Sequence, residues 1–290
     1  MGTSLLKTLS VFLSIGLISG IAQSKLKSFE LTPEWEAKIT ELAPDQPTAK
    51  PLKERNVLIF SLTTGFKHWC IPHTDAVVTL LGKKTGAYQS TVSTDIEVFK
   101  LDNLKKYDAV VLNNTCPDRK DRDTFRDVLI NKMSQFGTKY KDVPLEEREA
   151  LAKQSYENLV QYVSEGGGLV LLHGAITSFN NSEEFSALAG GSFDYHPPQQ
   201  EVILTPTDDT HPLLLPFEGK PFTHIDEPYI LKNAYSQFNF RPLLEMETTN
   251  LKDKRLKKLP SLPRYVAWIK PYNEGRVFFC SPSHNAQSFE

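Results

Sequence analysis

A histidine stands directly after a strongly apolar segment near the middle of the chain. Residues 168–172 (GLVLL) predict a buried strand, and His173, Gly174 and Ala175 follow at once. A turn at this place needs small residues but no imidazole, and a buried imidazole costs free energy unless it finds a polar partner. In serine- or cysteine-dependent α/β enzymes this strand-to-helix turn carries the nucleophile. A histidine there argues against acyl-enzyme chemistry and indicates a base, a hydrogen-bond donor or a metal ligand.

Other polar residues also follow predicted strands. His68 comes shortly after the apolar run 56–62, and His284 follows the run 276–281. In an open parallel sheet, ligands bind beyond the carboxyl ends of the strands, which meet at one edge. We therefore expect these segments to bring their side chains together. Further candidates for this edge are Gly65 and Phe66 after the first strand, Asn113 and Asn114 after residues 108–112, His196 beyond a Gly-Gly pair, and Asp226, Glu227 and Tyr229 in HIDEPY.

Several of these side chains are ligand types for a divalent metal ion such as zinc. His173, His196, Glu227 and His284, together with His68, offer imidazole nitrogens and a carboxylate. The sequence contains no HExxH or CxxC motif, so a metal site would have to be assembled from distant segments. Convergent histidines also serve as general acids and bases. The sequence leaves both interpretations open.

The remaining histidines have simpler interpretations. His211 precedes a proline in a predicted turn and receives no role, and His224 is interpretable as an exposed side chain. His73 is expected in the first turn of a helix, a position that the helix dipole does not favour for a cation. The glycines at 65, 190 and 191 indicate turns rather than a phosphate cradle, because no GxGxxG motif follows the first strand.

Strands and helices alternate through the first two thirds of the chain. The uninterrupted apolar runs at 56–62, 108–112 and 168–172 predict strands that are covered on both faces. A long helix with Pro144 near its start is predicted before the third of these strands. The alternation predicts an α/β fold with a doubly wound, mostly parallel, flavodoxin-like sheet, followed by a β-rich C-terminal part.

Three segments have distinct predicted roles. Residues 117–145 are charged and irregular and form an insertion, either a lid or a packed loop. A short helix is predicted after Asn181, with this asparagine as N-cap and Glu184 at the capping-box position. Residues 23–54 are polar and rich in proline, and they predict a leader segment that packs loosely on the domain and contains a short helix from Pro33.

Composition limits the classes of function. The 290 residues suit one large domain, and a net charge of −2 with 23% charged residues predicts no nucleic-acid partner. Lys7 and the apolar run before Ala22 have the layout of a secretory signal peptide, residues 1–22. We therefore expect export to the periplasm or the extracellular space, with no stable membrane span after cleavage. Three cysteines form no disulfide framework, and the sequence does not specify the oligomeric state.

Taken in order, several motifs resemble those of the ThuA-like family, which is named for trehalose utilisation. The motifs are FSLTTGFKH, YDAVVLNNT, GGGLVLLHGA, EEFSALAGGSFDYHPP, DEPY and GRVFFCSPSH. The resemblance implies a ThuA-like domain at residues 55–290, with a fold similar to class I glutamine amidotransferases but without their nucleophilic cysteine. Family members usually continue into a closing helix, and we expect this sequence to lack it. The resemblance implies functional roles for Gly65, Phe66, His68, His173, His196, Asp226, Glu227, Arg276 and His284.

Two classes of function fit these residues. The resemblance implies a small-molecule carbohydrate partner, such as a glycoside or a 3-keto-glycoside. An enzyme on that substrate would use His173 or His68 as base and Glu227 or His284 as acid, with a metal ion or Arg276 stabilising an enolate. The sequence favours the enzyme, because a binding protein has little use for buried imidazoles.

A non-catalytic sugar-binding module is the alternative. It would rely on aromatic rings and side-chain amides, and the candidates for these contacts are Phe66, Trp69, Phe179, Tyr195, Asn113 and Asn114. A cysteine-dependent amidotransferase is nearly excluded, because no cysteine occupies the turn at His173, although Cys116 lies at the end of a neighbouring strand.

Overall fold

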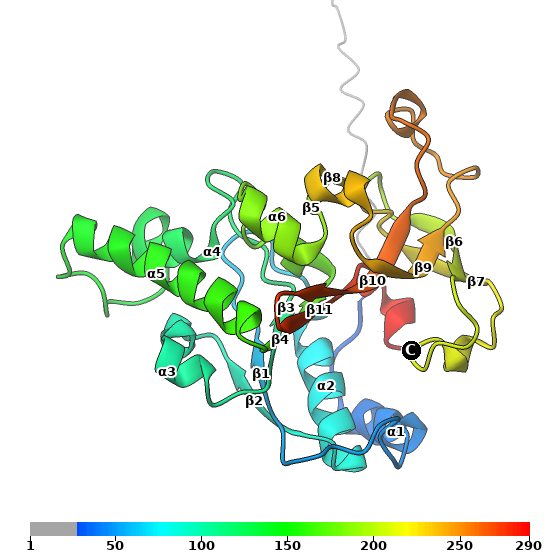
Figure 1. The fold of residues 1–290 in the computed structure, drawn as a ribbon, viewed down its shortest axis with the longest axis horizontal. Helices are drawn as coiled ribbons and strands as arrows, with labels where there is room; N and C mark the ends of the chain where they lie inside the picture. The colour runs from blue at the N-terminus through cyan, green and yellow to red at the C-terminus, as the bar shows by residue number, and fades with distance from the viewer. Residues whose placement is uncertain (1–27) are drawn as a thin grey trace, which may run out of the picture.

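The computed structural model describes residues 28–290, whose main feature is a nine-stranded sheet with the order β2-β1-β3-β4-β11-β10-β9-β6-β7 (Figure 1). The first five strands in that order pair in parallel, and the others pair antiparallel. Two further strands, β5 and β8, pair with each other. The predicted α/β fold with a mostly parallel sheet and a β-rich C-terminal part is confirmed. The predicted signal peptide, residues 1–22, lies outside the described residues.

The bounds of β1, β3, β4 and β11 follow the predicted apolar runs to within two residues at either end. The strands are β1 Asn56–Phe60, β2 Gln89–Ser93, β3 Ala109–Asn113, β4 Gly168–Leu172, β5 Ser192–Tyr195, β6 Gln200–Pro206, β7 Phe222–Asp226, β8 Ile230–Lys232, β9 Arg241–Met246, β10 Tyr265–Tyr272 and β11 Gly275–Cys280. The α-helices are α1 Pro33–Leu42, α2 Ile71–Thr85, α3 Leu101–Leu104, α4 Thr124–Arg126, α5 Leu145–Ser164 and α6 Glu183–Ala189.

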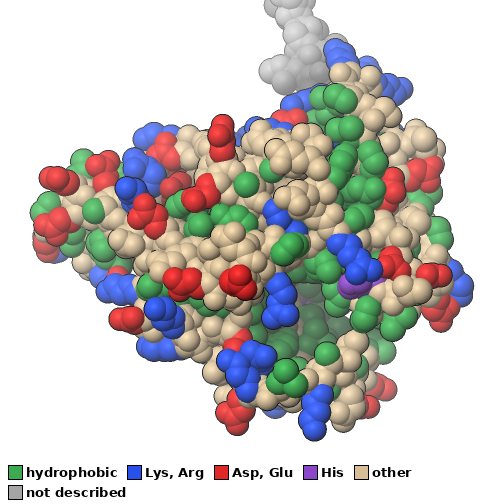
Figure 2. Space-filling model, viewed as in Figure 1, with side chains coloured by type: hydrophobic (Ala, Val, Ile, Leu, Met, Phe, Trp, Pro, Cys, Tyr) green, Lys and Arg blue, Asp and Glu red, His purple; other side chains and the backbone are tan. Residues whose placement is uncertain are grey.

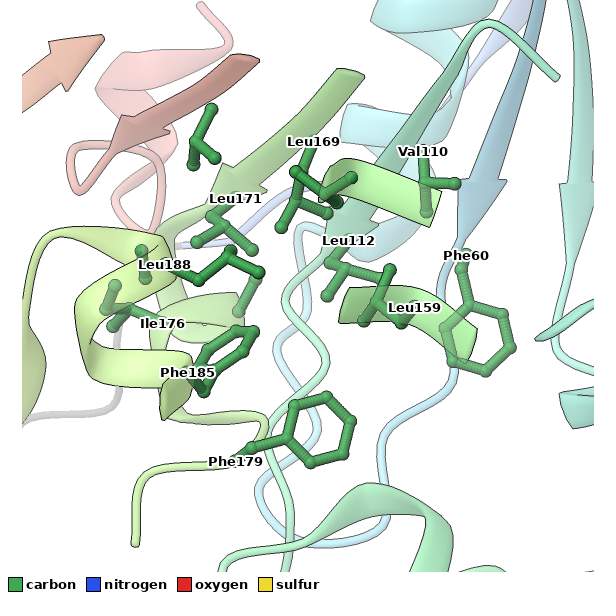
Figure 3. Packing of buried hydrophobic residues seen from close by; sticks show 14 of the residues in the cluster. Phe60, Val110, Leu112, Leu159, Leu169, Leu171, Ile176, Phe179, Phe185 and Leu188 are labelled. Atoms are coloured by element: carbon green, nitrogen blue, oxygen red, sulfur yellow. The ribbon is translucent and has the colours of Figure 1, made fainter. Parts of the chain in front are cut away.

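Helices cover both faces of the parallel part of the sheet, α5 and α6 on one side and α2 on the other (Figure 1). On the first side, Leu159 of α5 and Phe185 of α6 pack against Leu112 and Leu171 of the strands (Figure 3). All four side chains are buried, and each such burial stabilises the fold by about 1.5–3 kcal/mol. This packing fixes the strands, and with them the loops at their carboxyl ends.

Helix α6 is capped by a different residue from the one predicted. The hydroxyl of Ser182, not the side chain of Asn181, accepts a hydrogen bond from the backbone N–H of Phe185 at 3.0 Å. Asn181 instead donates its side-chain amide to the carbonyl of Asp121. Adjacent asparagine and serine residues are almost equally good N-caps, so only tertiary contacts decide between them.

This correction predicts unequal effects of two alanine variants. Ser182→Ala removes the cap and also a hydroxyl contact with Tyr156, so it is expected to lower the free energy of unfolding by about 1–2 kcal/mol. Asn181→Ala removes an exposed hydrogen bond and is expected to cost about 0.5 kcal/mol or less. Urea unfolding of both variants measures the difference, and an equal or larger loss for Asn181→Ala would contradict the assignment.

The insertion at residues 117–145 packs against the domain and holds the loop that follows β1. The buried carboxylate of Asp127 accepts hydrogen bonds from the Thr64 hydroxyl at 2.5 Å and from the backbone N–H of Asp118 at 2.7 Å. Lys132 donates to the Thr64 carbonyl at 2.8 Å. In this structure the segment is thus packed onto the loop that leads to His68.

The leader segment is more firmly attached than predicted. The ammonium group of Lys84, in α2, donates to the carbonyls of Thr40, Glu41 and Ala43 at the C-terminal end of α1. These bonds satisfy carbonyls that a helix end leaves without intrahelical partners. Trp35 of α1 also donates to the Phe289 carbonyl at 2.6 Å. Helix α1 is thus tied to the domain by specific hydrogen bonds, although none of its side chains is fully buried.

Charged side chains are spread over the face of the molecule seen in Figure 2. The same view shows a hollow at the place of α2, with hydrophobic side chains in its depth and Lys and Arg side chains at its border. In residues 28–290, no helix combines the length and the apolar character that crossing a membrane requires.

Candidate active site

The turn after β4 is built around a strained histidine. His173 has a φ angle of 48°, in the left-handed region, and begins a 3-10 helix at His173–Thr177. Such a conformation costs about 1–3 kcal/mol for a residue other than glycine and persists only where the surroundings enforce it. The next residue has no room for a side chain, because a Cβ on Gly174 would lie 2.4 Å from Cys116 Sγ and 2.9 Å from His68 Cε1. The predicted tight turn thus brings His68 and His173 together.

Both ring nitrogens of His173 have defined partners. Nδ1 lies 2.6 Å from the carbonyl oxygen of Ser281, and Nε2 lies 2.9 Å from the hydroxyl of Tyr229. A carbonyl can only accept, so Nδ1 carries the proton and donates it. This bond directs Nε2 into the site, which is the arrangement that orients metal-bound histidines in proteins. The Ser281 carbonyl was not predicted, because a backbone group leaves no signal in the sequence.

Two further histidines complete a buried cluster with His173. The ring centroids of His68 and His284 are 4.5 Å apart. The ring centroid of His173 lies 4.9 Å from that of His68 and 5.1 Å from that of His284. One nitrogen from each of the three rings lies within 4.8 Å of the other two. Both nitrogens of His284 and Nδ1 of His68 are buried without a hydrogen-bond partner. Buried polar atoms normally have partners, so these converging nitrogens are candidate ligands for a metal ion.

Glu227 places a carboxylate beside this cluster. Its Oε2 lies 3.2 Å from His173 Nε2 and 3.7 Å from His196 Nε2, and its Oε1 lies 2.9 Å from His284 Nδ1. The His284 contact lacks the geometry of a hydrogen bond. Burial alone would raise the pKa of Glu227, but its contacts with His173 and His284 prevail and hold the pKa well below its usual range. The carboxylate is therefore ionised.

The histidines respond differently to the same surroundings. Burial, reinforced by His173 and His284, lowers the pKa of His68 to about 2, so this imidazole is neutral. Burial also disfavours the charged form of His173, but Glu227 and Asp226 outweigh it and raise the pKa of this residue. Imidazole nitrogens next to an ionised carboxylate are donors that a divalent ion such as zinc takes in proteins, and a proton on His173 Nε2 would have to leave before that nitrogen could bind the ion.

Asp226 lies behind the site rather than in it. This carboxylate is 2% exposed, and its Oδ2 accepts hydrogen bonds from the backbone N–H groups of Ser283 at 2.8 Å and His284 at 3.1 Å. Burial opposes its ionisation, but a hydrogen bond from His224 and the charge of His173 keep its pKa below the usual value. Asp226 was predicted to bind substrate, and the structure instead places it where it holds the loop of His284.

The side-chain amides that were predicted to bind a sugar form hydrogen bonds inside the protein instead. Asn113 and Asn114 are fully buried. The amide of Asn113 donates to the Ile71 carbonyl and to Asp75, and the amide of Asn114 donates to Asn113. Gly65 is exposed, but it has no room for a side chain, because a Cβ there would lie 2.2 Å from the Pro117 carbonyl oxygen. The two asparagines therefore shape the site from within and do not face a substrate.

Two predicted residues do reach the mouth of the site. Phe66 is 59% exposed, and its ring lies 4.8 Å from that of His68 and 5.8 Å from that of His284. The His196 side chain is 35% exposed, and its ring stacks on Tyr229 at 5.7 Å. Tyr229 itself is buried and donates toward His173. An aromatic face and an accessible imidazole thus lie next to the buried cluster.

Arg276 is not brought to the site. It pairs with Gly168 at the start of β11, whereas His284 follows the end of that strand. A strand rises about 3.3 Å per residue, so the two ends of β11 lie about 15–20 Å apart. Arg276 lines a cavity of about 540 Å³ at the opposite, amino-end edge of the sheet. Phe179, predicted as a stacking residue, lies in the hydrophobic core (Figure 3).

The cysteines are not placed as nucleophiles. All three are free, and Sγ of Cys116 lies 3.5 Å from the Gly174 carbonyl oxygen behind the turn. Burial raises the pKa of Cys116 to about 11 and that of Cys70 to about 12. A thiol with such a pKa is a poor nucleophile at neutral pH.

The fold and the site define a class of α/β protein. A cluster of histidines and a carboxylate lies at the carboxyl ends of its parallel strands, where serine- or cysteine-dependent α/β enzymes carry a nucleophile. The ThuA family model, described as trehalose utilisation, matches residues 56–290, and the chain belongs to this family.

Solved structures agree on the fold. A ThuA-like protein from Bacteroides uniformis is 18% identical to this chain, with a TM-score of 0.55. The matched region covers 85% of this chain and 86% of the Bacteroides chain. A ThuA-like protein from Parabacteroides merdae is also 18% identical, with a TM-score of 0.53, and the matched region covers 80% of each chain. No curated protein sequence matched this chain.

Proposed function

We propose that this protein is a carbohydrate-active enzyme whose site holds a divalent metal ion such as zinc. The observation that carries the proposal is the convergence of one nitrogen each from the buried rings of His68, His173 and His284, with nitrogens of His68 and His284 that lack hydrogen-bond partners. Glu227 fits as a further ligand, because its oxygens lie 2.9–3.2 Å from two of these rings. Ligand atoms around a tetrahedral zinc ion are about 3.3 Å apart, given bonds of about 2.0–2.1 Å.

The proposed substrate is a sugar. Support comes from the family, described as trehalose utilisation, and from the exposed ring of Phe66 beside the cluster. The apolar face of a sugar ring packs on such an aromatic surface, while polar groups at the mouth fix its orientation. Glycosides and 3-keto-glycosides are the proposed substrates, and the signal-like sequence of residues 1–22 supports an exported location.

A 3-keto-glycoside suits the chemistry of these side chains. The ketone acidifies the proton on C2, and His196, the accessible imidazole, removes it. The electron pair of the C2–H bond forms a C1–C2 double bond as the bond from C1 to the leaving oxygen breaks. The leaving oxygen takes up a proton, and water then adds across the double bond, which completes hydrolysis. A divalent ion, when bound, would polarise the sugar carbonyl as a Lewis acid.

The non-catalytic alternative has lost part of its support. It needed amides that bond sugar hydroxyls, and Asn113 and Asn114 are fully buried in internal hydrogen bonds. It also needed the ring of Phe179, which lies in the hydrophobic core. Phe66 remains available for stacking, but stacking gives no reason for buried nitrogens of His68 and His284 without hydrogen-bond partners.

The proposed role of His196 predicts a selective loss of activity. His196→Gln is expected to lower turnover of a 3-keto-glycoside by about 10²–10⁴-fold, the usual contribution of a general base or acid. Metal content is expected to stay unchanged, because this ring is outside the buried cluster. The measurement is a turnover assay on paired glycosides and 3-keto-glycosides, with elemental analysis of the same preparations.

The matched control is His211→Gln, which changes a histidine in the loop after β6, outside the candidate site. Unchanged turnover in His196→Gln would remove this residue from the mechanism. No turnover of any substrate by a metal-loaded parent would favour the binding module instead.

A further inference from the structure

An aromatic cluster joins both ends of the described chain to the candidate site. It consists of Phe29, Trp35, Trp69, His73 and Phe289, from the leader, α1, the loop after β1, α2 and the C-terminal segment. His73 lies at its centre, with the rings of the other four at 4.7–5.7 Å. Neither nitrogen of His73 has a hydrogen-bond partner, so ring packing alone holds this residue.

Two tryptophans of this cluster hold the segment that carries His284. Nε1 of Trp69 donates to the carbonyl of His284 itself at 2.9 Å. Nε1 of Trp35 donates to the carbonyl of Phe289, five residues later, at 2.6 Å. On the other side of the segment, Asp226 accepts from the backbone N–H of His284. The backbone at His284 is therefore clamped between a carboxylate and an indole.

Trp69 is also the residue directly after His68. An indole that is fixed in the aromatic cluster and bonded to the His284 carbonyl therefore sets the separation between two of the three clustered histidines. Ring centroids of Trp69 lie 5.5 Å from Phe29 and 5.9 Å from Phe289, so leader and C-terminal residues both restrain it. Nothing in this arrangement lets Trp69 act on a substrate directly.

We propose that Trp69 is a positioning residue that holds His284 against His68, and that residues 28–42 act as a brace by keeping Trp69 in place. The consequence for metal binding rests on the proposed function, whereas the restraint on residues 281–289 does not. Residues 28–42 then help to fix the geometry of the site.

The test compares two Trp→Phe variants of the full chain. Trp69→Phe keeps an aromatic ring but removes the N–H that bonds the His284 carbonyl. Trp268→Phe is the matched control, because it removes an equivalent bond to the Ala189 carbonyl in the core. Hydrogen–deuterium exchange of the peptide covering 281–289 is the first readout, and zinc affinity by competition with a chromophoric chelator is the second.

Trp69→Phe is expected to speed exchange in residues 281–289 by about fivefold and to weaken zinc binding similarly, as loss of one hydrogen bond implies. Trp268→Phe is expected to leave both unchanged. Trp35→Phe removes the bond to the Phe289 carbonyl and leaves His68, His173 and His284 untouched. It is also expected to speed exchange in residues 281–289, and it replaces Trp69→Phe as the test if that variant does not fold.

The outcomes separate the two proposals. Unchanged exchange in both Trp69→Phe and Trp35→Phe would overturn the brace. Faster exchange with unaltered zinc affinity would overturn the positioning role of Trp69. Faster exchange in a protein whose parent binds no zinc would support the brace and refute the metal site.

Discussion

His284→Ala is expected to reduce bound zinc from about one ion per chain to nearly none. The residue supplies a buried imidazole whose Nδ1 contacts the Glu227 carboxylate and whose Nε2 has no partner, so the ring can donate to a metal ion. Loss of a partner that only orients a ligand lowers metal affinity about 10–100-fold, and loss of a ligand itself should cost more. Elemental analysis of the purified protein after zinc loading and dialysis measures the change.

A second ligand variant guards against misfolding. His173→Asn suits the left-handed backbone at this position better than alanine does, because asparagine tolerates positive φ. It removes the nitrogen directed into the site, and the same loss of zinc is expected. His211→Ala, outside the cluster, should retain the ion. A parent without metal, or variants that both keep it, would leave the histidines as acid–base or binding groups.

Gly174→Ala is expected to disturb both the fold and the site. The new Cβ would meet Cys116 Sγ at 2.4 Å and His68 Cε1 at 2.9 Å, distances at which atoms must move. Overpacking of this kind costs about 1–3 kcal/mol of unfolding free energy. Because one of the displaced atoms belongs to His68, zinc affinity is expected to fall as well. Urea unfolding and zinc competition report the two effects.

The double variant Gly174→Ala/Cys116→Ala separates the two contacts. Replacing Cys116 removes the sulfur atom that the new Cβ would meet first, so the double variant should regain part of the lost unfolding free energy. Cys116→Ala alone provides the reference for the cycle. The contact with His68 persists, so zinc affinity should stay lowered. Strictly additive effects would show that crowding against Cys116 is not what destabilises the single variant.

The family and the proposed chemistry fit together at the turn after β4. A nucleophile at such a turn would be a serine or cysteine, and this chain has His173 there with both nitrogens engaged. The nearest thiol, Cys116, lies behind the turn with a pKa raised to about 11 by burial. The turn therefore does not suit nucleophilic catalysis, which is consistent with the acid–base and Lewis-acid chemistry that we propose.

The sequence by itself determined the fold class and the edge at which the site lies. Buried parallel strands are uninterrupted apolar runs, and their carboxyl ends meet, so residues directly after them converge. That reasoning placed His68, His173 and His284 together, and the structure confirms their convergence. Arg276 was suggested by the family resemblance and not by this reasoning, and the structure places it at the opposite edge, near the start of β11.

Only the tertiary structure decided which polar side chains face the site and which serve the protein interior. Asn113, Asn114 and Asp226 are residue types that bind ligands, but here they form hydrogen bonds with other segments of the chain. Asn113 donates to the Ile71 carbonyl, Asn114 accepts from the backbone N–H of Gly174, and Asp226 accepts from that of His284. The partners of Trp35 and Trp69 lie 254 and 215 residues away in the chain. Local sequence patterns report periodicity and turn chemistry, whereas such long-range pairings depend on how the whole chain packs.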